Sequence, residues 1–321
     1  MNPGDVSPTP ANIPIVDFSR FLSGNPKSRQ AAVQEIFQAC HDVGFLYLKH
    51  HGIPAHIIEQ ALIQSRLFFE LPLDEKQNIA WSSEHSNSGY IGIERESLDN
   101  SQPGDLKEAF NVGNENAAVA NGLPLRTNRW PTGQPLFYQT ISDFFEICSG
   151  AVEQIFRAFA CALSMPADYL VERHQNHDYT LRLLHYPPIA QPSLPGQLRA
   201  GSHSDYGSLT LLFQDNVGGL EVQTTNGDWI TAPTIPDTIL INTGDLMERW
   251  SNNVFRSTKH RVRLPDGAQT QQHRYSIAFF CQPDADTDIV CLPTCHSDHN
   301  PPQYTPVKSG DYLLGRLRAT Y

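Results

Sequence analysis

The second half of the chain is divided into many short apolar runs, and this pattern limits the fold more than any other feature of the sequence. From about residue 179 onward, Gly, Pro, Asn and Asp interrupt the apolar stretches. The runs are 181–186, 208–213, 219–223, 238–242, 254–263 and 274–281. Short strands closed by turn residues are typical of a β-sandwich or barrel. The sequence therefore predicts a mainly β core for this half.

The first half of the chain is expected to contribute an α/β module and flanking helices. Residues 1–12 hold three prolines and almost no apolar side chains, which favours a disordered lead-in. Order is expected to begin at residues 13–18, and residues 45–48 have the composition of a strand. Helical spacing is found in two further sets of apolar side chains: Ala32, Val33, Ile36, Phe37 and Cys40, and Ile57, Ile58, Ala61, Leu62 and Phe69.

The middle of the chain combines a loop-rich stretch with one long helix. Residues 82–135 are rich in Ser, Asn, Gly and Pro, and such segments often lie over a functional site. The apolar residues from Phe137 to Phe159 recur at helical spacing. The predicted organisation is an N-terminal module at 13–120, a linking helical region at 121–174, a β core at 175–285 and a C-terminal extension at 286–321 that packs on the core.

The charge of the chain argues against a nucleic-acid-binding protein. Its 23 Lys and Arg against 34 Asp and Glu give a net charge of −11 and a pI of about 5.6. No apolar stretch reaches the about 18 residues of a membrane span, and no export signal is recognisable. Six scattered cysteines do not suggest a disulfide framework. We expect a cytoplasmic protein that acts on a small molecule, without nucleic acid, membrane or obligate protein partner.

Two histidines and an aspartate form a candidate metal site. His203 and Asp205 are two residues apart just before an apolar run, so in an extended segment both side chains leave the same face. His260 lies in another strand-like run. Two imidazoles and one carboxylate are the ligand set of non-haem Fe(II) oxygenases and leave coordination positions open. A His-x-Asp pair by itself more often shares a hydrogen bond in a turn, so other residues must support the metal.

A candidate receptor for a carboxylate lies on the last long strand. Arg274 and Ser276 begin the run 274–281 and project to one side if the run is extended. A guanidinium and a hydroxyl together bind a carboxylate well. An interior arginine needs an anion, and a dicarboxylate that chelates the iron at its other end would supply one.

These motifs together resemble the isopenicillin N synthase-like family of 2-oxoglutarate/Fe(II) dioxygenases, from about residue 13 to the C-terminus. The resemblance rests on His203-x-Asp205, His260, Arg274-x-Ser276, Ile13–Phe18, Asp105–Glu108 and Leu184–Pro187. It implies a double-stranded β-helix, or jelly roll, with helices outside it. It also implies Fe(II), 2-oxoglutarate and O₂ as cofactor and co-substrates.

The resemblance also assigns roles to individual residues. His203, Asp205 and His260 correspond to the iron ligands of the family, and Arg274 and Ser276 to the residues that hold the distal carboxylate of 2-oxoglutarate. The hydroxyl of Tyr186 is expected to join that carboxylate. Plant members carry Asn two residues before this tyrosine, but Leu184 stands here. Oxidative decarboxylation to succinate and CO₂ would then drive hydroxylation, or desaturation, of a substrate C–H bond.

The substrate is less constrained than the reaction. Within the family, the stretches 181–187, 203–214 and 274–281 look most similar to fungal thymine 7-hydroxylase-like enzymes, which suggests a small planar substrate. Tyr206 and Phe280 are candidates to clamp a flat ring, although aromatic side chains in short strands also serve as core. Arg182 is either an interior hydrogen-bond donor or a surface charge. Tyr90 is a candidate lid residue.

Several alternatives remain at the level of sequence. The same jelly-roll pocket could belong to a catalytically silent ligand-binding protein, to a family oxidase that does not use 2-oxoglutarate, or to a zinc hydrolase. Residues 291–299 contain Cys and His, but their spacing does not match a usual zinc site. Lys107 and Glu108 have the simplest interpretation as a surface ion pair.

Overall fold

Two β-sheets packed face to face form the centre of the molecule. The computed structural model describes residues 13–83, 86–98, 102–115, 127–189, 194–265 and 267–320; the predicted lead-in at 1–12 lies outside them. The larger sheet contains, in spatial order, β1 (Ile15–Asp17), β2 (Phe45–Lys49), β10 (Thr238–Thr243), β7 (Leu209–Gln214), β12 (Arg274–Cys281), β5 (Thr180–Tyr186), β4 (Glu108–Gly113) and β3 (Gly89–Ile91). The smaller sheet contains β6 (Ala200–His203), β11 (His260–Val262), β8 (Leu220–Gln223) and β9 (Trp229–Thr231).

The larger sheet separates two apolar clusters because successive side chains of a strand point to opposite faces. Leu181, Leu183 and Ile277 belong to the cluster on the helical side. Their neighbours Leu184 and Ala278 belong to the cluster between the two sheets. The smaller sheet adds Ala200, Leu220, Val222 and Val262 to that inner cluster. The predicted jelly-roll core therefore has its interior between the sheets.

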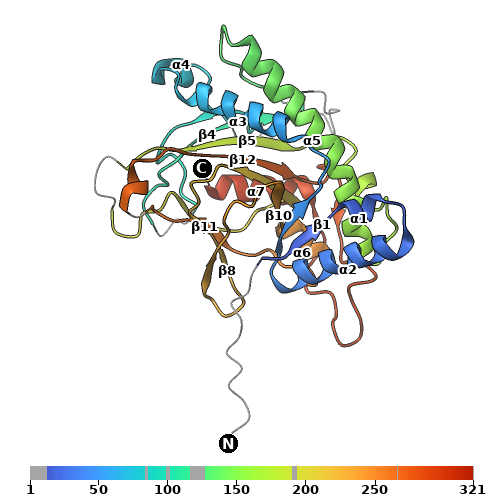
Figure 1. Ribbon diagram of the computed structural model, residues 1–321. Helices are drawn as coiled ribbons and strands as arrows, with labels where there is room; N and C mark the ends of the chain where they lie inside the picture. Colours follow the sequence, from blue (N-terminus) through green and yellow to red (C-terminus); the bar gives the residue numbers. More distant parts are fainter. Residues whose placement is uncertain are drawn as a thin grey trace, which may run out of the picture.

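Helices cover the outer face of the larger sheet (Figure 1). They are α2 (Pro26–Asp42), α3 (Ala55–Phe69) and α5 (Pro135–Ala162), with the short helices α1 (Ser19–Leu22) and α4 (Leu73–Gln77) beside them. Phe144 and Phe145 of α5 contact Phe213 of β7 and Phe279 of β12, with ring centroids 5.0 and 5.2 Å apart. The apolar stripe predicted for the long helix is the face that packs on the sheet.

The N-terminal strands belong to the same sheet as the core strands. β2 pairs with β10 in antiparallel register, with Tyr47 opposite Leu240, and β4 pairs in the same way with β5. Gly44 turns the chain from α2 into β2 with a φ of 76°, and a Cβ there would lie 2.6 Å from the Arg256 carbonyl oxygen. The predicted N-terminal module thus extends the core sheet directly.

One of the predicted strand runs is mostly not a strand. Within 254–263 only β11 is extended, because Asn252 and Asn253 turn the chain with positive φ values and Phe255 is buried against Phe37 and Phe159. The remaining elements are η2 (Val171–Arg173), α6 (Asp245–Trp250), η3 (Gly267–Gln271), β13 (Asp288–Ile289), β14 (Val307–Lys308) and α7 (Ser309–Thr320).

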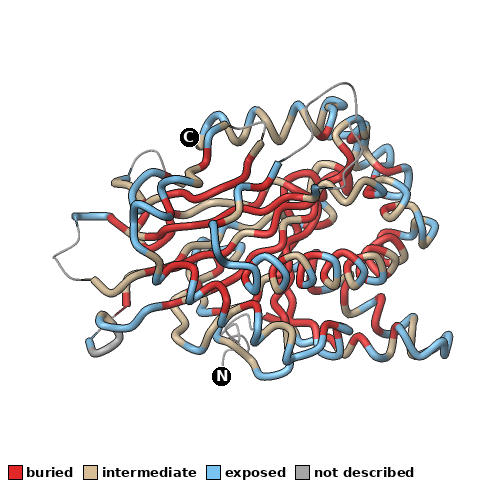
Figure 2. Tube along the Cα trace, turned by 90° about the horizontal axis from the view of Figure 1, so that it is seen from above, coloured by how far each residue is buried: buried red, intermediate tan, exposed pale blue. Residues whose placement is uncertain are grey.

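The C-terminal helix α7 takes a different position from the other long helices. Figure 1 shows it on the opposite side of β12 from α3 and α5, and Leu313, Leu317 and Thr320 line a cavity there. Figure 2 shows the buried strand segments side by side in the middle, with exposed segments at the periphery. In the described parts of the chain, we find no helix with the length and apolar character needed to cross a bilayer.

Candidate functional site

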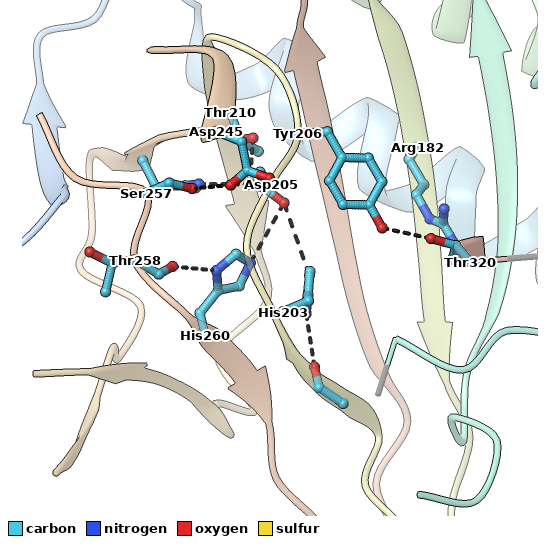
Figure 3. A network of polar contacts seen from close by, with 12 residues as sticks. Arg182, His203, Asp205, Tyr206, Thr210, Asp245, Ser257, Thr258, His260 and Thr320 are labelled. Atoms are coloured by element: carbon cyan, nitrogen blue, oxygen red, sulfur yellow. Dashed lines mark hydrogen bonds and ion pairs between the residues drawn. The ribbon is translucent and has the colours of Figure 1, made fainter. Parts of the chain in front are cut away.

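Three potential metal ligands meet where β6 ends and β11 begins. His203 ends β6, Asp205 follows two residues later, and His260 begins β11 directly opposite His203 in the strand register. Their ligand atoms all lie within 4.8 Å of one another, and Figure 3 shows the three side chains turned toward a common point. Asp205 Oδ1 is 4.0 Å from His203 Nε2 and 3.7 Å from His260 Nε2. The predicted trio is therefore assembled in space.

The surrounding contacts leave the correct atoms available for a metal. His203 Nδ1 lies 2.8 Å from the Gly201 carbonyl oxygen, and His260 Nδ1 lies 3.2 Å from that of Thr258. A proton on each Nδ1 satisfies these carbonyls and leaves each Nε2 lone pair free. Oδ2 of Asp205 accepts hydrogen bonds from Thr210 Oγ1 at 2.5 Å and Asn242 Nδ2 at 2.6 Å. Only Oδ1 therefore remains for an ion.

The electrostatics favour the protonation state that a metal requires. Burial, and then the neighbouring His260, lower the pKa of His203 to about 3, so its imidazole is neutral near pH 7. Burial by itself would raise the pKa of Asp205, but His260, His203 and the two donors lower it below its ordinary value. A neutral imidazole beside an ionised carboxylate suits a divalent cation.

Two glycines allow the loop with Asp205 to approach its neighbours closely. A Cβ on Gly207 would lie 2.7 Å from the Cys281 carbonyl oxygen, and one on Gly244 would lie 2.4 Å from the Gly207 carbonyl oxygen. Real Cβ contacts at these distances do not occur, so any side chain would push the loop away from β12 and α6. The position of Asp205 depends on these two residues.

A buried guanidinium lies deeper between the sheets and has no acidic partner within the described residues. Arg274 is 1% exposed, its Nη2 donates to Gln214 Oε1 at 3.0 Å, and its Nη1 lies 3.4 Å from Ser276 Oγ. Its Nε is buried and has no acceptor in the part of the chain that the structure describes. The Tyr186 ring packs against the guanidinium at 4.7 Å. A buried cation with an unused donor is a receptor for an anion, so the side chains fit a carboxylate co-substrate.

A second buried arginine at this end was not predicted from the sequence. Arg199, 1% exposed, donates from Nη2 to the carbonyl oxygens of Pro187 at 3.2 Å and Gln272 at 2.9 Å. It thereby ties together the ends of the strands that carry Tyr186 and Arg274. Burial, and then the charge of Arg274, lower the pKa of Arg199 to about 10. Two neighbouring buried cations increase the positive potential of this compartment.

A cavity of about 140 Å³ opens beside His203 and Asp205. It is small compared with the ~300–1,000 Å³ of pockets for drug-sized ligands. Besides His203 and Asp205 themselves, four of the predicted site residues line it: Arg182, Tyr186, Tyr206 and Phe280. Arg182 is therefore an interior residue, as one of the two interpretations required. Apolar walls come from Leu98, Leu184, Leu313 and Leu317.

The prediction that Tyr90 forms part of a lid is wrong in position. Tyr90 is 3% exposed on β3, lies in the apolar cluster under the helices and does not line the cavity. Its hydroxyl donates to Glu108 Oε2 at 2.5 Å. The ring packs near Phe68 of α3, with centroids 6.5 Å apart. Its aromatic character serves the core between sheet and helices.

The interpretation of Lys107 and Glu108 as a surface ion pair is also corrected. Both are buried and on opposite faces of the sheet edge. Lys107 lines the cavity, where its Nζ contacts Asp105 and lies 3.3 Å from Glu96 Oε2. Glu108 faces the helical side and pairs with Lys76 at 2.8 Å. Glu96 also binds Arg182 Nη2, so Glu96 joins two cations at the wall of the cavity.

Helix α7 is fastened over the cavity by polar contacts. The Tyr206 hydroxyl lies 2.7 Å from Thr320 Oγ1 (Figure 3), and the guanidinium of Arg316 lies 4.4 Å from the centre of the Tyr206 ring. Tyr312 donates to Asp245 Oδ2 at 2.9 Å. No motif in the sequence marks this role of the C-terminal segment. The available signal was the four-residue spacing of Leu313 and Leu317, which places both side chains on one face of a helix.

The comparisons with known proteins agree with this site. Residues 13–133 match the family described as the N-terminal region of the non-haem dioxygenase in morphine synthesis, and residues 177–283 match the 2OG-Fe(II) oxygenase superfamily. A 2-oxoglutarate-Fe(II) type oxidoreductase, ppzD, of Metarhizium rileyi is 31% identical over 95% of this chain and 90% of its own. The proline hydroxylase buaE of Petromyces alliaceus is 33% identical over 95% and 98%.

A solved structure is similar over nearly the whole chain. Neurospora crassa thymine 7-hydroxylase in complex with alpha-KG and thymine has a TM-score of 0.87, 36% identity and coverage of 96% and 97% of the two chains. The chain belongs to the 2OG-Fe(II) oxygenase superfamily. It is an oxidoreductase with a jelly-roll core that uses Fe(II), 2-oxoglutarate and O₂ to oxidise a small molecule.

Proposed function

We propose that this enzyme hydroxylates a C–H bond of a small planar molecule held in the cavity beside His203 and Asp205. The observation that carries the proposal is that an anion receptor, three metal ligands and a cavity are neighbours in one interior. Arg274, without an acidic partner in the described chain, packs against Tyr186, and Tyr186 lines the same cavity as His203 and Asp205. Anion, metal and substrate would then be held next to one another.

The ligand set assigns the metal and the co-substrate to particular side chains. His203 Nε2, His260 Nε2 and Asp205 Oδ1 would hold Fe(II), which supplies the oxidising chemistry with 2-oxoglutarate and O₂ and gives succinate and CO₂. Arg274 and Ser276 would hold the distal carboxylate of 2-oxoglutarate, joined by Tyr186. The hydrogen bonds of Thr210 and Asn242 keep Asp205 from rotating, so one oxygen stays directed at the ion.

Three further residues would position the substrate. Tyr206 and Phe280 reach the cavity from different segments and would hold a flat ring by stacking. Arg316 covers one face of the Tyr206 ring, so the other face serves the ligand. Arg182 would donate hydrogen bonds to an acceptor on the ring. The structural relative from Neurospora crassa, crystallised with thymine, is consistent with a ligand of this size.

Anaerobic spectroscopy and product analysis test the proposal. Addition of Fe(II) and 2-oxoglutarate should produce a weak visible charge-transfer band, and pyrimidines or methylated aromatic compounds should stimulate succinate release. His203→Ala should lose both signals and serve as the negative control. A wild-type protein without the band, or without substrate-stimulated succinate over the whole panel, would contradict the assignment.

The proposal also places the reaction in the cytoplasm. All six cysteines are free thiols, and four of them are buried: Cys40, Cys148, Cys281 and Cys295. Free thiols suit a reducing compartment. Fractionation of cells that express the native protein tests the location, and recovery in a membrane-enclosed or secreted fraction would contradict it.

A further inference from the structure

We propose that the enzyme selects an uncharged substrate with a carbonyl group next to an N–H group, and that Glu96 excludes carboxylates. This inference rests on the proposed function, because it concerns the same cavity. The inference rests on Arg182, Glu96 and Asn111. Of these three, only Arg182 was identified from the sequence as a candidate substrate-binding residue. The class of substrate would be a planar cyclic amide or imide.

Away from the metal ligands, the charges at the cavity wall form one balanced cluster. Arg182, Lys107 and Glu96 line the cavity, and Asp105, which does not line it, supplies the second anion through its contact with Lys107. Glu96 contacts both cations, and Asp105 contacts Lys107 and accepts from the Gly201 amide at 2.8 Å. Glu96, Lys107 and Asp105 are 3%, 4% and 2% exposed, so water screens them little. These four side chains form a neutral ion-paired cluster, and three of its members line the cavity.

A carboxylate substrate would disturb this balance. To reach Arg182 it would have to approach Glu96 or displace it, and either arrangement leaves a negative charge without a partner in a buried site. Uncompensated buried charges are among the most unfavourable arrangements in proteins. An uncharged ligand avoids this cost. Glu96 therefore disfavours the binding of carboxylate compounds and also orients Arg182.

The strand register places a donor and an acceptor side by side. Asn111 of β4 lies directly opposite Arg182 of β5, and both line the cavity. Opposite side chains on one face of antiparallel strands have Cβ atoms roughly 4.5–5.5 Å apart. Arg182 can only donate, so it matches a carbonyl oxygen of the ligand. The pair thus offers complementary groups at the spacing of one small functional group.

The amide of Asn111 defines the second half of that functional group. Its Nδ2 donates to Asn87 Oδ1 at 3.0 Å, which fixes the orientation of the amide. Its Oδ1 is buried and has no hydrogen-bond donor among the described residues. A buried acceptor without a donor is costly, so a ligand N–H that supplies the donor gains affinity. Carbonyl and N–H on adjacent ring atoms, as in a cyclic amide, satisfy Arg182 and Asn111 together.

Binding of three matched ring compounds tests the inference. The probes are 3-methyl-2-pyridone, its N-methyl derivative and 2-methylbenzoate, titrated anaerobically into the enzyme with Fe(II) and 2-oxoglutarate by calorimetry and by the shift of the visible band. Wild type should bind the pyridone at least about tenfold more tightly than either of the others, the effect of about one hydrogen bond or one misplaced charge.

Two variants identify the responsible residues. Glu96→Gln should raise the affinity for 2-methylbenzoate by about tenfold or more, because it releases the positive charge of Arg182 and Lys107. Asn111→Leu should weaken the affinity for the pyridone by about tenfold and leave the affinity for 2-methylbenzoate unchanged. The matched control is Glu94→Gln, since Glu94 binds Gln197 and does not line the cavity. It should leave all three affinities within about twofold of wild type.

The outcomes separate this inference from the proposed function. Equal binding of pyridone and 2-methylbenzoate by wild type, or no change in selectivity in Glu96→Gln and Asn111→Leu, overturns the inference. So does a lack of binding by all three compounds to enzyme that shows the charge-transfer band. In each case the band itself remains, and the assignment of the iron and 2-oxoglutarate site stands. Loss of the band in wild type contradicts the proposed function instead.

Discussion

Two arginines face the interior of the same barrel and differ in what surrounds their charge. Arg274, which is fully buried, has a glutamine, a serine and a tyrosine ring as neighbours and no acidic partner among the described residues. Arg182, which is partly buried and lines the cavity, is joined to Glu96. Burial makes an unpaired cation costly, so the first arginine is suited to an incoming anion and the second to an uncharged ligand.

The difference bears on which ligand each arginine would bind. A dicarboxylate would be favoured at Arg274 and disfavoured at Arg182, because Glu96 already compensates the charge of Arg182. Tyr186, which packs on Arg274, and Arg182 both line the cavity that His203 and Asp205 also line. The presence or absence of an acidic partner at each arginine therefore sets which of the two proposed ligands that arginine would bind.

Removal of one of the proposed metal ligands should give the largest effect. Residues that merely orient a ligand contribute about 10–100-fold to metal affinity, so Asp205→Ala should reduce iron affinity and turnover by more than about 100-fold. Asn242→Ala removes one hydrogen-bond donor to Asp205 and should reduce iron affinity by only about 10–100-fold. Iron content after anaerobic loading and succinate formation are the measurements. Full iron occupancy in Asp205→Ala would contradict the assignment.

Exchange of each arginine for methionine tests the comparison itself. Arg274→Met should raise the KM for 2-oxoglutarate by about 30-fold or more, because a desolvated charge pair is lost. Arg182→Met should leave that KM within about threefold and raise the KM for the substrate instead. Steady-state kinetics with each compound varied in turn gives both values. Similar effects of the two variants on 2-oxoglutarate would remove the distinction.

A paired carboxylate outside the barrel should affect stability alone. Glu108 binds Lys76 at 2.8 Å, His185 at 2.7 Å and Tyr90 at 2.5 Å on the helical face of the sheet. Glu108→Gln leaves the Lys76 charge uncompensated and should lower the free energy of unfolding by about 1–3 kcal/mol. Urea denaturation measures this change. A shift in the selectivity between pyridone and 2-methylbenzoate in this variant would argue against the specific role of Glu96.

The same carboxylate predicts a pH dependence. Burial alone would raise the pKa of Glu108, but hydrogen bonds with His185, Lys76 and Tyr90 lower it below the ordinary 4.5. Because the folded pKa lies below the unfolded one, Glu108 stabilises the fold above about pH 4.5, and this contribution is lost as pH falls through the folded pKa. Unfolding free energy should therefore fall more steeply with acidification in wild type than in Glu108→Gln. Parallel pH profiles would contradict this.

Loosening of α7 should give the smallest effect. Tyr312→Phe removes one hydrogen bond to Asp245 and leaves the apolar contacts of the helix in place. The KM for substrate should rise by less than about fivefold, with the KM for 2-oxoglutarate unchanged, since Leu313, Leu317 and Thr320 of α7 line the cavity proposed for the substrate. A larger change in the KM for 2-oxoglutarate would mean that α7 also influences the Arg274 site.

The sequence predicted those parts of the molecule that depend on local spacing. The run 274–281 coincides with β12, and the two-residue spacing of His203 and Asp205 and of Arg274 and Ser276 places each pair on one side of the chain. Such periodicity is a property of the strand itself. It needs no knowledge of the rest of the fold.

Features that depend on distant contacts were not predicted. Glu96 lies in a loop without periodicity, and its partner Arg182 is 86 positions further along the chain. Tyr90 lies in a stretch whose composition is typical of a lid, but its ring is buried under α3 and its hydroxyl donates a hydrogen bond to Glu108. Phe255 belongs to the apolar run 254–263 that was predicted as a strand, but its ring packs against Phe37 of α2 and Phe159 of α5. Apolar character alone does not tell which surface a residue covers.

The pairing of β2 with β10 has a consequence for the time course of folding. Tyr47 and Leu240 are register partners although 193 residues separate them (240 − 47 = 193). At a synthesis rate of roughly 5–20 residues per second, the apolar strand Phe45–Leu48 would wait about 10–40 s for its neighbour. Sheets with such distant partners fold slowly, and unpaired strand edges aggregate. We therefore expect the yield of folded enzyme to depend strongly on temperature and on chaperones during synthesis.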